Sequence, residues 1–159
     1  MQSGFTFTDE EASAIAFAES FEAAAQVAVA ALARIREAGG EIAQICGPIS
    51  TGGLGSRELN MQRFRNAIAC ALSAGRVLFD QRPFEDAIAR LSPDHSAENY
   101  DARILEEFYR AVFTSGHITR ILLLPDWESS HGARWERSLA VELGITIEDY
   151  PIEWLLEVS

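Results

Sequence analysis

The sequence contains no lysine, and all 13 of its basic residues are arginines. Without lysine the chain cannot form a Schiff base, so pyridoxal chemistry and lysine-dependent aldolase chemistry are excluded. The phosphate-binding loop of standard nucleoside triphosphatases also requires a lysine. The 24 acidic residues give a net charge of −11, which argues against binding polymeric nucleic acid, because that affinity comes largely from neutralised phosphates. A single phosphate can still be held by backbone N–H groups and one arginine.

Cysteine and long apolar runs are also scarce. Cys46 and Cys70 are the two cysteines, and both lie among apolar residues, which predicts reduced, buried thiols. No apolar run reaches the roughly 18–20 residues that a membrane span needs, and the acidic N-terminal region does not resemble a signal peptide. The three histidines have no metal-ligand spacing. We therefore expect a cytoplasmic protein that needs neither a metal nor a cofactor.

The N-terminal 40 residues read as one long helix. Thr8 and Glu11 form a capping-box pattern, and Gly39-Gly40 would end the helix after Ala38. Its apolar stripe is spaced by three and four residues and consists of Phe17, Phe21, Ala24, Ala28, Ala31 and Ile35. We expect this face to pack on the rest of the domain or on a second copy of the chain, so a homo-oligomer (dimer or higher) is predicted.

Residues 41–159 alternate between strand and helix patterns. Strands are predicted at residues 41–46, 76–79, 118–124 and 145–147, and helices at 57–74, 83–91, 97–113, 132–143 and 151–158. This alternation predicts an α/β domain with a small parallel sheet of about four strands and helices on both faces. The domain boundary is placed at residues 40 and 41.

Two segments place polar groups just beyond the C-terminal ends of predicted strands, where open α/β sheets bind ligands. The first, residues 45–53, is rich in glycine and allows a ligand to approach the backbone closely. Its candidate binding residues are Gly47, Pro48, Ile49, Ser50, Gly52 and Gly53. Arg57 and Asn60 follow and are candidates to hold a phosphate or sugar; the alternative is ordinary helix-surface polarity.

The second segment, residues 122–136, contains the candidate catalytic residues. Glu136 lies about one turn into a helix, among small and apolar neighbours, which favours a sheltered carboxylate; the alternative is an ordinary glutamate near a helix start. Ser130 and Gly132 begin the same helix and could bind an anion or hydroxyl, although Ser130 could simply cap it. Asp126 and His131 are candidates for proton transfer. Trp127 could stack on a base or belong to the core.

These residues together resemble the nucleoside 2-deoxyribosyltransferase-like superfamily, in particular its small phage and bacterial domains of the DUF4406 type. The resemblance covers about residues 42–147. It runs through Ile45-Cys46-Gly47-Pro48-Ile49-Ser50-Thr51-Gly52, Asn60, Phe64, Ala67, Gly75-Arg76-Val77, Leu123-Leu124-Pro125 and Trp127-x-x-Ser130-x-Gly132-Ala133-x-x-Glu136-x-x-x-Ala140-x-x-Leu143-Gly144.

The resemblance implies a Rossmann-like three-layer fold and cleavage of the N-glycosidic bond of a nucleoside or nucleoside 5′-monophosphate. In it, Glu136 matches the family's nucleophile, and Ser130 matches a position that contacts sugar or phosphate. Of two aspartates usual in the family, the position of the first is held by Thr119 and that of the second falls near Ala111. The acid that protonates the leaving base is therefore open, with Asp126, His131, Asp101 and Glu107 as candidates.

Three functions follow as expectations. The first is a hydrolase, or a 2-deoxyribosyltransferase, in which Glu136 attacks or stabilises C1′. The second is a nucleotide-binding or sensing module on the same fold that does not cleave its ligand. The third is an assembly protein in which the N-terminal helix forms a dimer. The expected partner in the first two cases is a small nucleoside or nucleotide, with no polymeric nucleic acid and no membrane.

Overall fold

The computed structural model describes residues 7–96 and 98–156 and contains a parallel sheet of three strands. The strands are β1 (Ile42–Cys46), β2 (Ile118–Leu123) and β3 (Thr146–Asp149), in the order β1-β2-β3. The parallel α/β class predicted from the sequence is confirmed. In place of a fourth strand, residues 76–79 contribute one parallel bridge between Leu78 and Ala43.

The helices follow the predicted pattern with shifted ends. They are α1 (Asp9–Phe17), α2 (Phe21–Glu37), α3 (Arg57–Ser73), α4 (Arg82–Leu91), α5 (Arg110–Thr114), α6 (His131–Leu143) and α7 (Ile152–Leu156). A π-helical segment, η1 (Ile104–Tyr109), leads directly into α5, and a 3₁₀ turn, η2 (Trp127–Ser129), precedes α6. The helix expected from residue 97 therefore begins only at Ile104. The last residues of the expected terminal helix lie outside the described residues.

The prediction of one long N-terminal helix is wrong, because the chain forms two helices there. The capping box of Thr8 and Glu11 is present, but Ala18 is extended and Ser20 caps a second helix by accepting a hydrogen bond from Ala23 N. The break turns Phe17 out of the apolar stripe and leaves it 79% exposed, whereas Phe21, Ala28 and the other alanines of the stripe are buried in the core. This face packs on the domain, and self-association stays a prediction.

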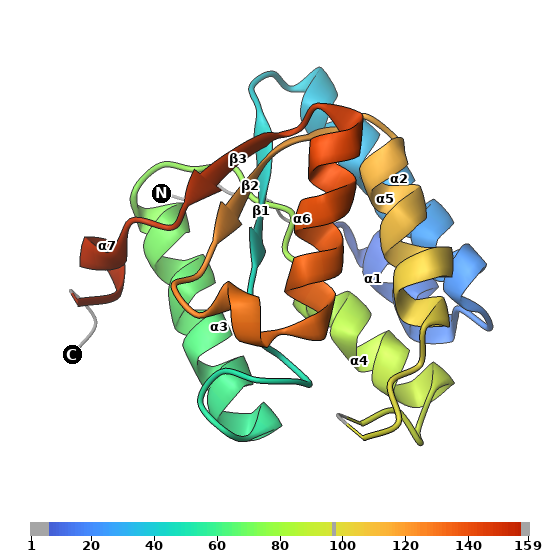
Figure 1. The fold of residues 1–159 in the computed structure, drawn as a ribbon. Helices are drawn as coiled ribbons and strands as arrows, with labels where there is room; N and C mark the ends of the chain where they lie inside the picture. Colours follow the sequence, from blue (N-terminus) through green and yellow to red (C-terminus); the bar gives the residue numbers. More distant parts are fainter. Residues whose placement is uncertain (1–6, 97, 157–159) are drawn as a thin grey trace.

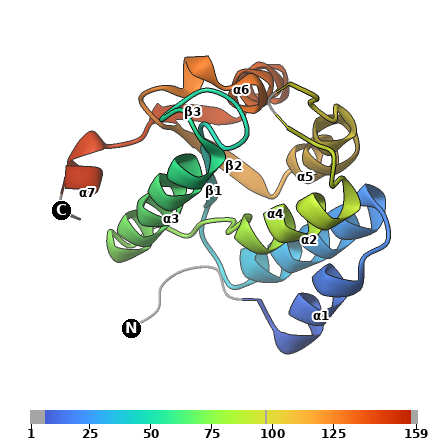
Figure 2. The ribbon, with the colours of Figure 1, turned by 90° about the horizontal axis from the view of Figure 1, so that it is seen from below.

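Helices cover both faces of the sheet (Figures 1 and 2). Side chains alternate along β1 as the pleat requires. Ala43 and Ile45 point to a core formed with α3 and α7, which includes Phe64 and Ile68. Ile42 and Cys46 point to the larger core on the opposite face, formed with α1, α2, α4, η1, α5 and α6. Gln44 shares this second face with Cys46, which places a polar side chain beneath α6.

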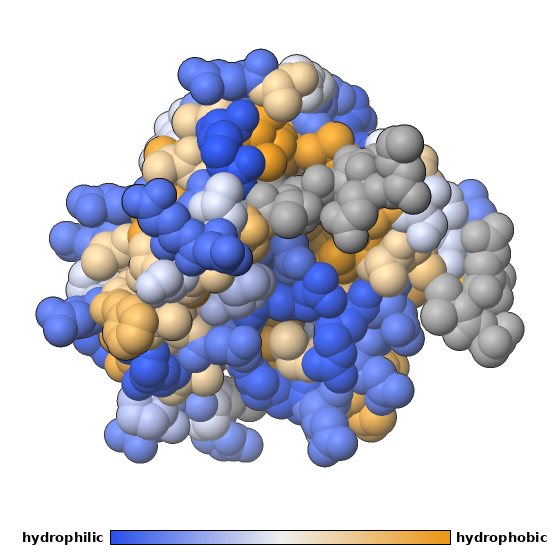
Figure 3. Space-filling model, turned by 180° about the vertical axis from the view of Figure 1, so that it is seen from behind, coloured by the Kyte–Doolittle hydropathy of each residue, from blue (hydrophilic) through white to orange (hydrophobic). Residues whose placement is uncertain are grey.

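The chain carries a net charge of −11. Seen from behind, the apolar colour is confined to separate patches between hydrophilic side chains (Figure 3). Among the described residues, no helix combines the length and the apolar character needed to span a bilayer.

Candidate functional site

A cavity lies between the end of β1, α4, η1 and the start of α6. Its enclosed volume is about 40 Å³, roughly the space of one water molecule. The lining combines an apolar floor with polar side chains from four parts of the chain: Gly47, Ile49, Ser50, Thr51, Gln81, Glu85, Ile88, His95, Tyr100, Ile104, Leu105, Tyr109, Ser130, Gly132, Ala133 and Glu136. The cavity thus joins the two segments singled out in the sequence and adds two further segments.

Glu136 lies on the wall formed by α6 and is only 6% exposed. Gln44 Nε2 donates a hydrogen bond to Glu136 Oε2 at 2.8 Å. Burial raises the pKa of Glu136 to about 8, and the negative charge of Glu85 adds to this, while hydrogen bonds from Cys46 and Gln44 oppose it. The carboxyl group is therefore sheltered, and at neutral pH it holds its proton. The local sequence predicted this shelter correctly.

Glu85 is a second buried acid, which sequence reasoning missed. It lies in the first turn of α4, is 7% exposed and lines the same cavity. Tyr109 donates a hydrogen bond from its hydroxyl group to Glu85 Oε2 at 2.6 Å, and Arg57 Nη2 lies 3.9 Å from Glu85 Oε1. Burial raises the pKa of Glu85, while Tyr109 and Arg57 oppose the rise. One sequence feature could have predicted its burial: Glu85 lies beside the apolar residues Phe84 and Ile88 on one face of the helix.

Ser130 and Gly132 lie at the cavity as expected, at the start of α6. Ser130 also caps the helix, because its hydroxyl group accepts a hydrogen bond from Ala133 N at 3.1 Å. Gly47 lies where β1 ends, and a Cβ atom there would overlap the side chain of Leu124. A glycine is needed here for packing against Leu124, the residue after β2, as well as for the shape of the cavity.

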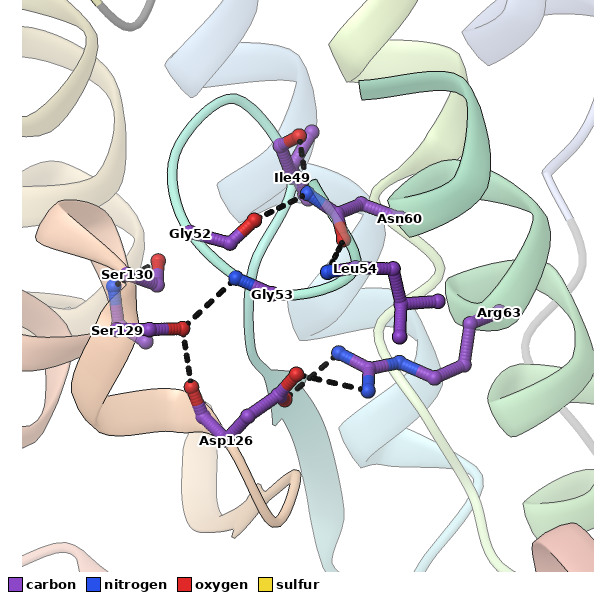
Figure 4. Close-up of polar contacts among 10 residues, drawn as sticks. Ile49, Gly52, Gly53, Leu54, Asn60, Arg63, Asp126, Ser129 and Ser130 are labelled. Carbon is purple, nitrogen blue, oxygen red and sulfur yellow. Dashed lines mark hydrogen bonds and ion pairs between the residues drawn. The ribbon is translucent and has the colours of Figure 1, made fainter. Parts of the chain in front are cut away.

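The glycine-rich loop after β1 is tied down by Asn60 (Figure 4). The Asn60 side chain accepts a hydrogen bond from Leu54 N at 2.8 Å and donates to Ile49 O and Gly52 O, each at 3.1 Å. Asn60 is 1% exposed and is absent from the cavity wall. The sequence placed Asn60 against a phosphate or sugar; in the structure it holds the loop instead.

Replacing Asn60 with alanine should therefore destabilise the protein through the loop. Three hydrogen bonds to the loop backbone are lost, together with the packing of a side chain that is fully buried, at a cost of about 2–4 kcal/mol. Urea unfolding measures this loss, and faster amide exchange at Leu54 would place it in the loop. Asn66→Ala, on the same helix, is the control. Equal stability of the two variants would show that Asn60 does not anchor the loop.

Further contacts close the loop over the start of α6. Ser129 Oγ accepts a hydrogen bond from Gly53 N at 2.8 Å, and Thr51 Oγ1 accepts one from His131 N at 2.8 Å. Gly52 and Gly53 adopt positive φ angles of 68° and 71°. A Cβ atom at Gly52 would overlap Ser129, and one at Gly53 would overlap Asn60 and Pro48. These two glycines therefore fit the loop against protein, and neither lines the cavity.

Asp126 lies outside the cavity wall. Its carboxylate is held by Arg63, whose Nη1 and Nη2 donate at 2.9 and 2.7 Å (Figure 4). This bidentate ion pair links α3 to the turn after β2 and occupies both carboxylate oxygens. His131 and Trp127 are also absent from the lining. The guanidinium group of Arg137 lies over the Trp127 ring at 5.3 Å.

The segment between α4 and η1 supplies two aromatic rings, those of His95 and Tyr100, although the sequence predicted Tyr100 within a helix over residues 97–113. Tyr100 packs against His95 on one side and His131 on the other, with ring centroids 4.5 and 4.6 Å apart. His95 Nε2 lies 3.0 Å from Ser50 Oγ, and Asp101 N donates to His95 Nδ1 at 3.0 Å. Neutral His95 therefore carries its proton on Nε2, and this N–H group donates a hydrogen bond to Ser50 Oγ. This contact joins the two loops that border the cavity.

No protein-family profile, curated protein or solved structure matches this chain significantly. Within the described residues, no group of three His, Cys, Asp or Glu side chains lies close enough together to hold a metal ion. The chemistry that the cavity offers through its side chains is that of two carboxyl groups, with tyrosine, serine and amide groups around them. Such pairs of carboxyl groups are suited to acid–base and nucleophilic steps.

Proposed function

We propose that this protein cleaves the N-glycosidic bond of a nucleoside or nucleoside 5′-monophosphate, on a Rossmann-like fold of the nucleoside 2-deoxyribosyltransferase-like superfamily. The observation that carries the proposal is the burial of Glu136 in a cavity at the carboxyl ends of parallel strands. The same cavity is bordered by Ser130 and by the loop from Gly47 to Thr51. These are the elements through which the resemblance assigns sugar binding and attack at C1′.

In this proposal, Glu136 reacts in its ionised form. Gln44 donates to Oε2, and the Cys46 thiol also interacts with the carboxyl group; both interactions favour the carboxylate. Positive charge that develops on the sugar ring at an oxocarbenium-like transition state favours it further. Ser130 and Ser50 offer hydroxyl groups for the sugar or phosphate. Hydrolysis is favoured over transfer, because no feature of the sequence marks a second pocket for an accepting base.

A panel of ribo- and deoxyribonucleosides and their 5′-monophosphates tests the proposal. We expect at least one of them to release its free base together with the matching sugar or sugar phosphate, both detected by chromatography. Adding a second free base to the reaction separates hydrolysis from transfer, because transfer yields a new nucleoside. If every compound in the panel is recovered intact, the glycosidase proposal is rejected.

The small size of the cavity favours a second candidate, a nucleotide-binding module. An enclosed volume of about 40 Å³ is far below the roughly 300–1,000 Å³ of typical ligand pockets. A nucleoside can enter only if the Ser50–His95 and Thr51–His131 contacts separate. Ligand binding would then be coupled to loop opening, as in a sensor. Tight binding by calorimetry, with the ligand intact after long incubation, would favour this function.

A further inference from the structure

We propose that Glu85 supplies the second carboxyl group of the reaction and protonates the leaving base while Glu136 acts at C1′. The proposal rests on the glycosidase function and identifies the acid that the sequence left open. Within the described part of the chain, Glu85 and Glu136 are the acidic residues of this cavity wall. They come from different helices, α4 and α6, so a ligand entering the cavity meets one carboxyl group from each.

The carboxyl groups that the sequence offered as candidates to protonate the leaving base lie outside this cavity. Asp126 is paired with Arg63 outside the cavity. Asp101 accepts hydrogen bonds from Arg103 and Ser92, which hold its pKa well below the usual range. Glu107 borders a separate groove beside α2. None of these carboxyl groups lines the cavity that contains Glu136.

An independent observation marks the Glu85 wall as a surface that meets a ligand. Gln81 stands at the N-cap position of the same helix, four residues before Glu85, but its side chain makes no capping hydrogen bond; it is 3% exposed and lines the cavity. Among the described residues, no group donates a hydrogen bond to its buried Oε1 atom. A buried acceptor without a donor costs about 1–3 kcal/mol. A donor on a bound ligand would relieve this cost, which indicates that α4 faces the ligand with both Gln81 and Glu85.

The step balances with these two carboxyl groups. As the C1′–N bond breaks, its electron pair goes to the base nitrogen, which takes the proton from Glu85, while the Glu136 carboxylate bonds to C1′. Water then attacks C1′, the bond to Glu136 breaks, and Glu85 takes the proton of that water. The free base and the sugar leave, and both carboxyl groups return to their starting forms.

The environment of Glu85 allows it to gain and lose this proton. The charged and titratable groups around it are Arg57 from α3, Asp86 from α4, Tyr100 from the loop before η1, Tyr109 from η1 and Glu136 from α6. Burial and the neighbouring carboxylates favour the protonated form, whereas Arg57 and the Tyr109 hydroxyl group favour the ionised form. Negative charge on either Glu85 or Glu136 favours a proton on the other, so one of the two can hold a proton while the other is ionised.

Glu85→Gln tests the role through leaving groups of different basicity. On the nucleoside that wild type cleaves, the variant should be about 10²–10⁴-fold slower, because a glutamine cannot donate the proton. On the p-nitrophenyl glycoside of the same sugar, whose leaving group needs no proton, the loss should be far smaller. Glu142→Gln, an exposed acid on α6, is the control, and thermal unfolding checks that each variant folds.

Tyr109→Phe adds a readout that a purely structural role would not change. Losing the hydrogen bond raises the pKa of Glu85, so the alkaline limb of the pH profile of kcat/KM should move to higher pH. Equal losses on both substrates, or an unmoved pH profile, would overturn the assignment of Glu85 while leaving the glycosidase function in place. If wild type cleaves no nucleoside in the panel, both proposals fail together.

Discussion

Glu136→Gln should abolish base release while leaving the fold intact. The amide cannot act as the nucleophile or as the counter-charge for the sugar cation, so we expect a loss on the order of 10³–10⁵-fold in kcat/KM. The loss should be similar for a nucleoside and for the p-nitrophenyl glycoside of the same sugar, because attack at C1′ is common to both. This pattern differs from that expected for Glu85→Gln, in which the second substrate is largely spared.

The variant is well suited to the test because the site can accept the new side chain. Glutamine has nearly the same shape as glutamate, and its carbonyl oxygen can still accept the hydrogen bond from Gln44. Glu142→Gln on the exposed face of α6 provides the matched control, which should retain the wild-type rate. Steady-state kinetics and thermal unfolding on the three proteins give the result. Wild-type rates in Glu136→Gln would remove this residue from the mechanism.

Local sequence signals predicted the part of the site on α6. Ser130 is a strong N-cap, Gly144 ends the helix with a φ of 73°, and both depend on neighbouring residues alone. The small and apolar residues around Glu136 predicted that it is buried. The same argument applied to Glu85, which lies next to Phe84 on the buried face of α4, but no motif drew attention to it. The two carboxyl groups line one cavity only because α4 and α6 both pack into the core on the same face of the sheet.

Long-range partners explain the residues whose positions were not predicted. Nothing in the sequence indicated a partner for Asp126. Its partner Arg63 lies 63 residues away along the chain, on α3. Asn60 looked like a ligand-binding residue, yet its amide satisfies three backbone groups of the loop before it. Both polar side chains found partners within the protein, and neither pairing has a spacing that a sequence pattern reveals.

The buried carboxyl group of Glu136 should make the stability of the protein fall as the pH rises. In the unfolded chain this carboxyl group ionises near its ordinary pKa of 4.5, whereas burial in the folded protein raises the pKa to about 8. Below pH 4.5 both states hold the proton, so the group has no effect there. Between pH 4.5 and 8 the unfolded state loses the proton first, and the folded state loses stability over this interval, by an amount on the order of 3–5 kcal/mol.

Glu136→Gln removes this ionisation and should therefore be more stable than wild type at pH 8, although the two proteins should be similar near pH 4.5. Urea unfolding followed by tryptophan fluorescence from pH 4.5 to 9 measures the difference, since Trp127 and Trp135 pack against the core close to α6. Glu85 contributes in the same direction because its pKa is also raised, so some pH dependence should persist in the variant. The Glu142→Gln control should follow the wild-type curve.

Free energies of unfolding that run parallel for wild type and Glu136→Gln across this range would mean that Glu136 ionises in the folded protein as it does in water. Glu136 would then not be shielded from water, and the proposed reactivity depends on that shielding.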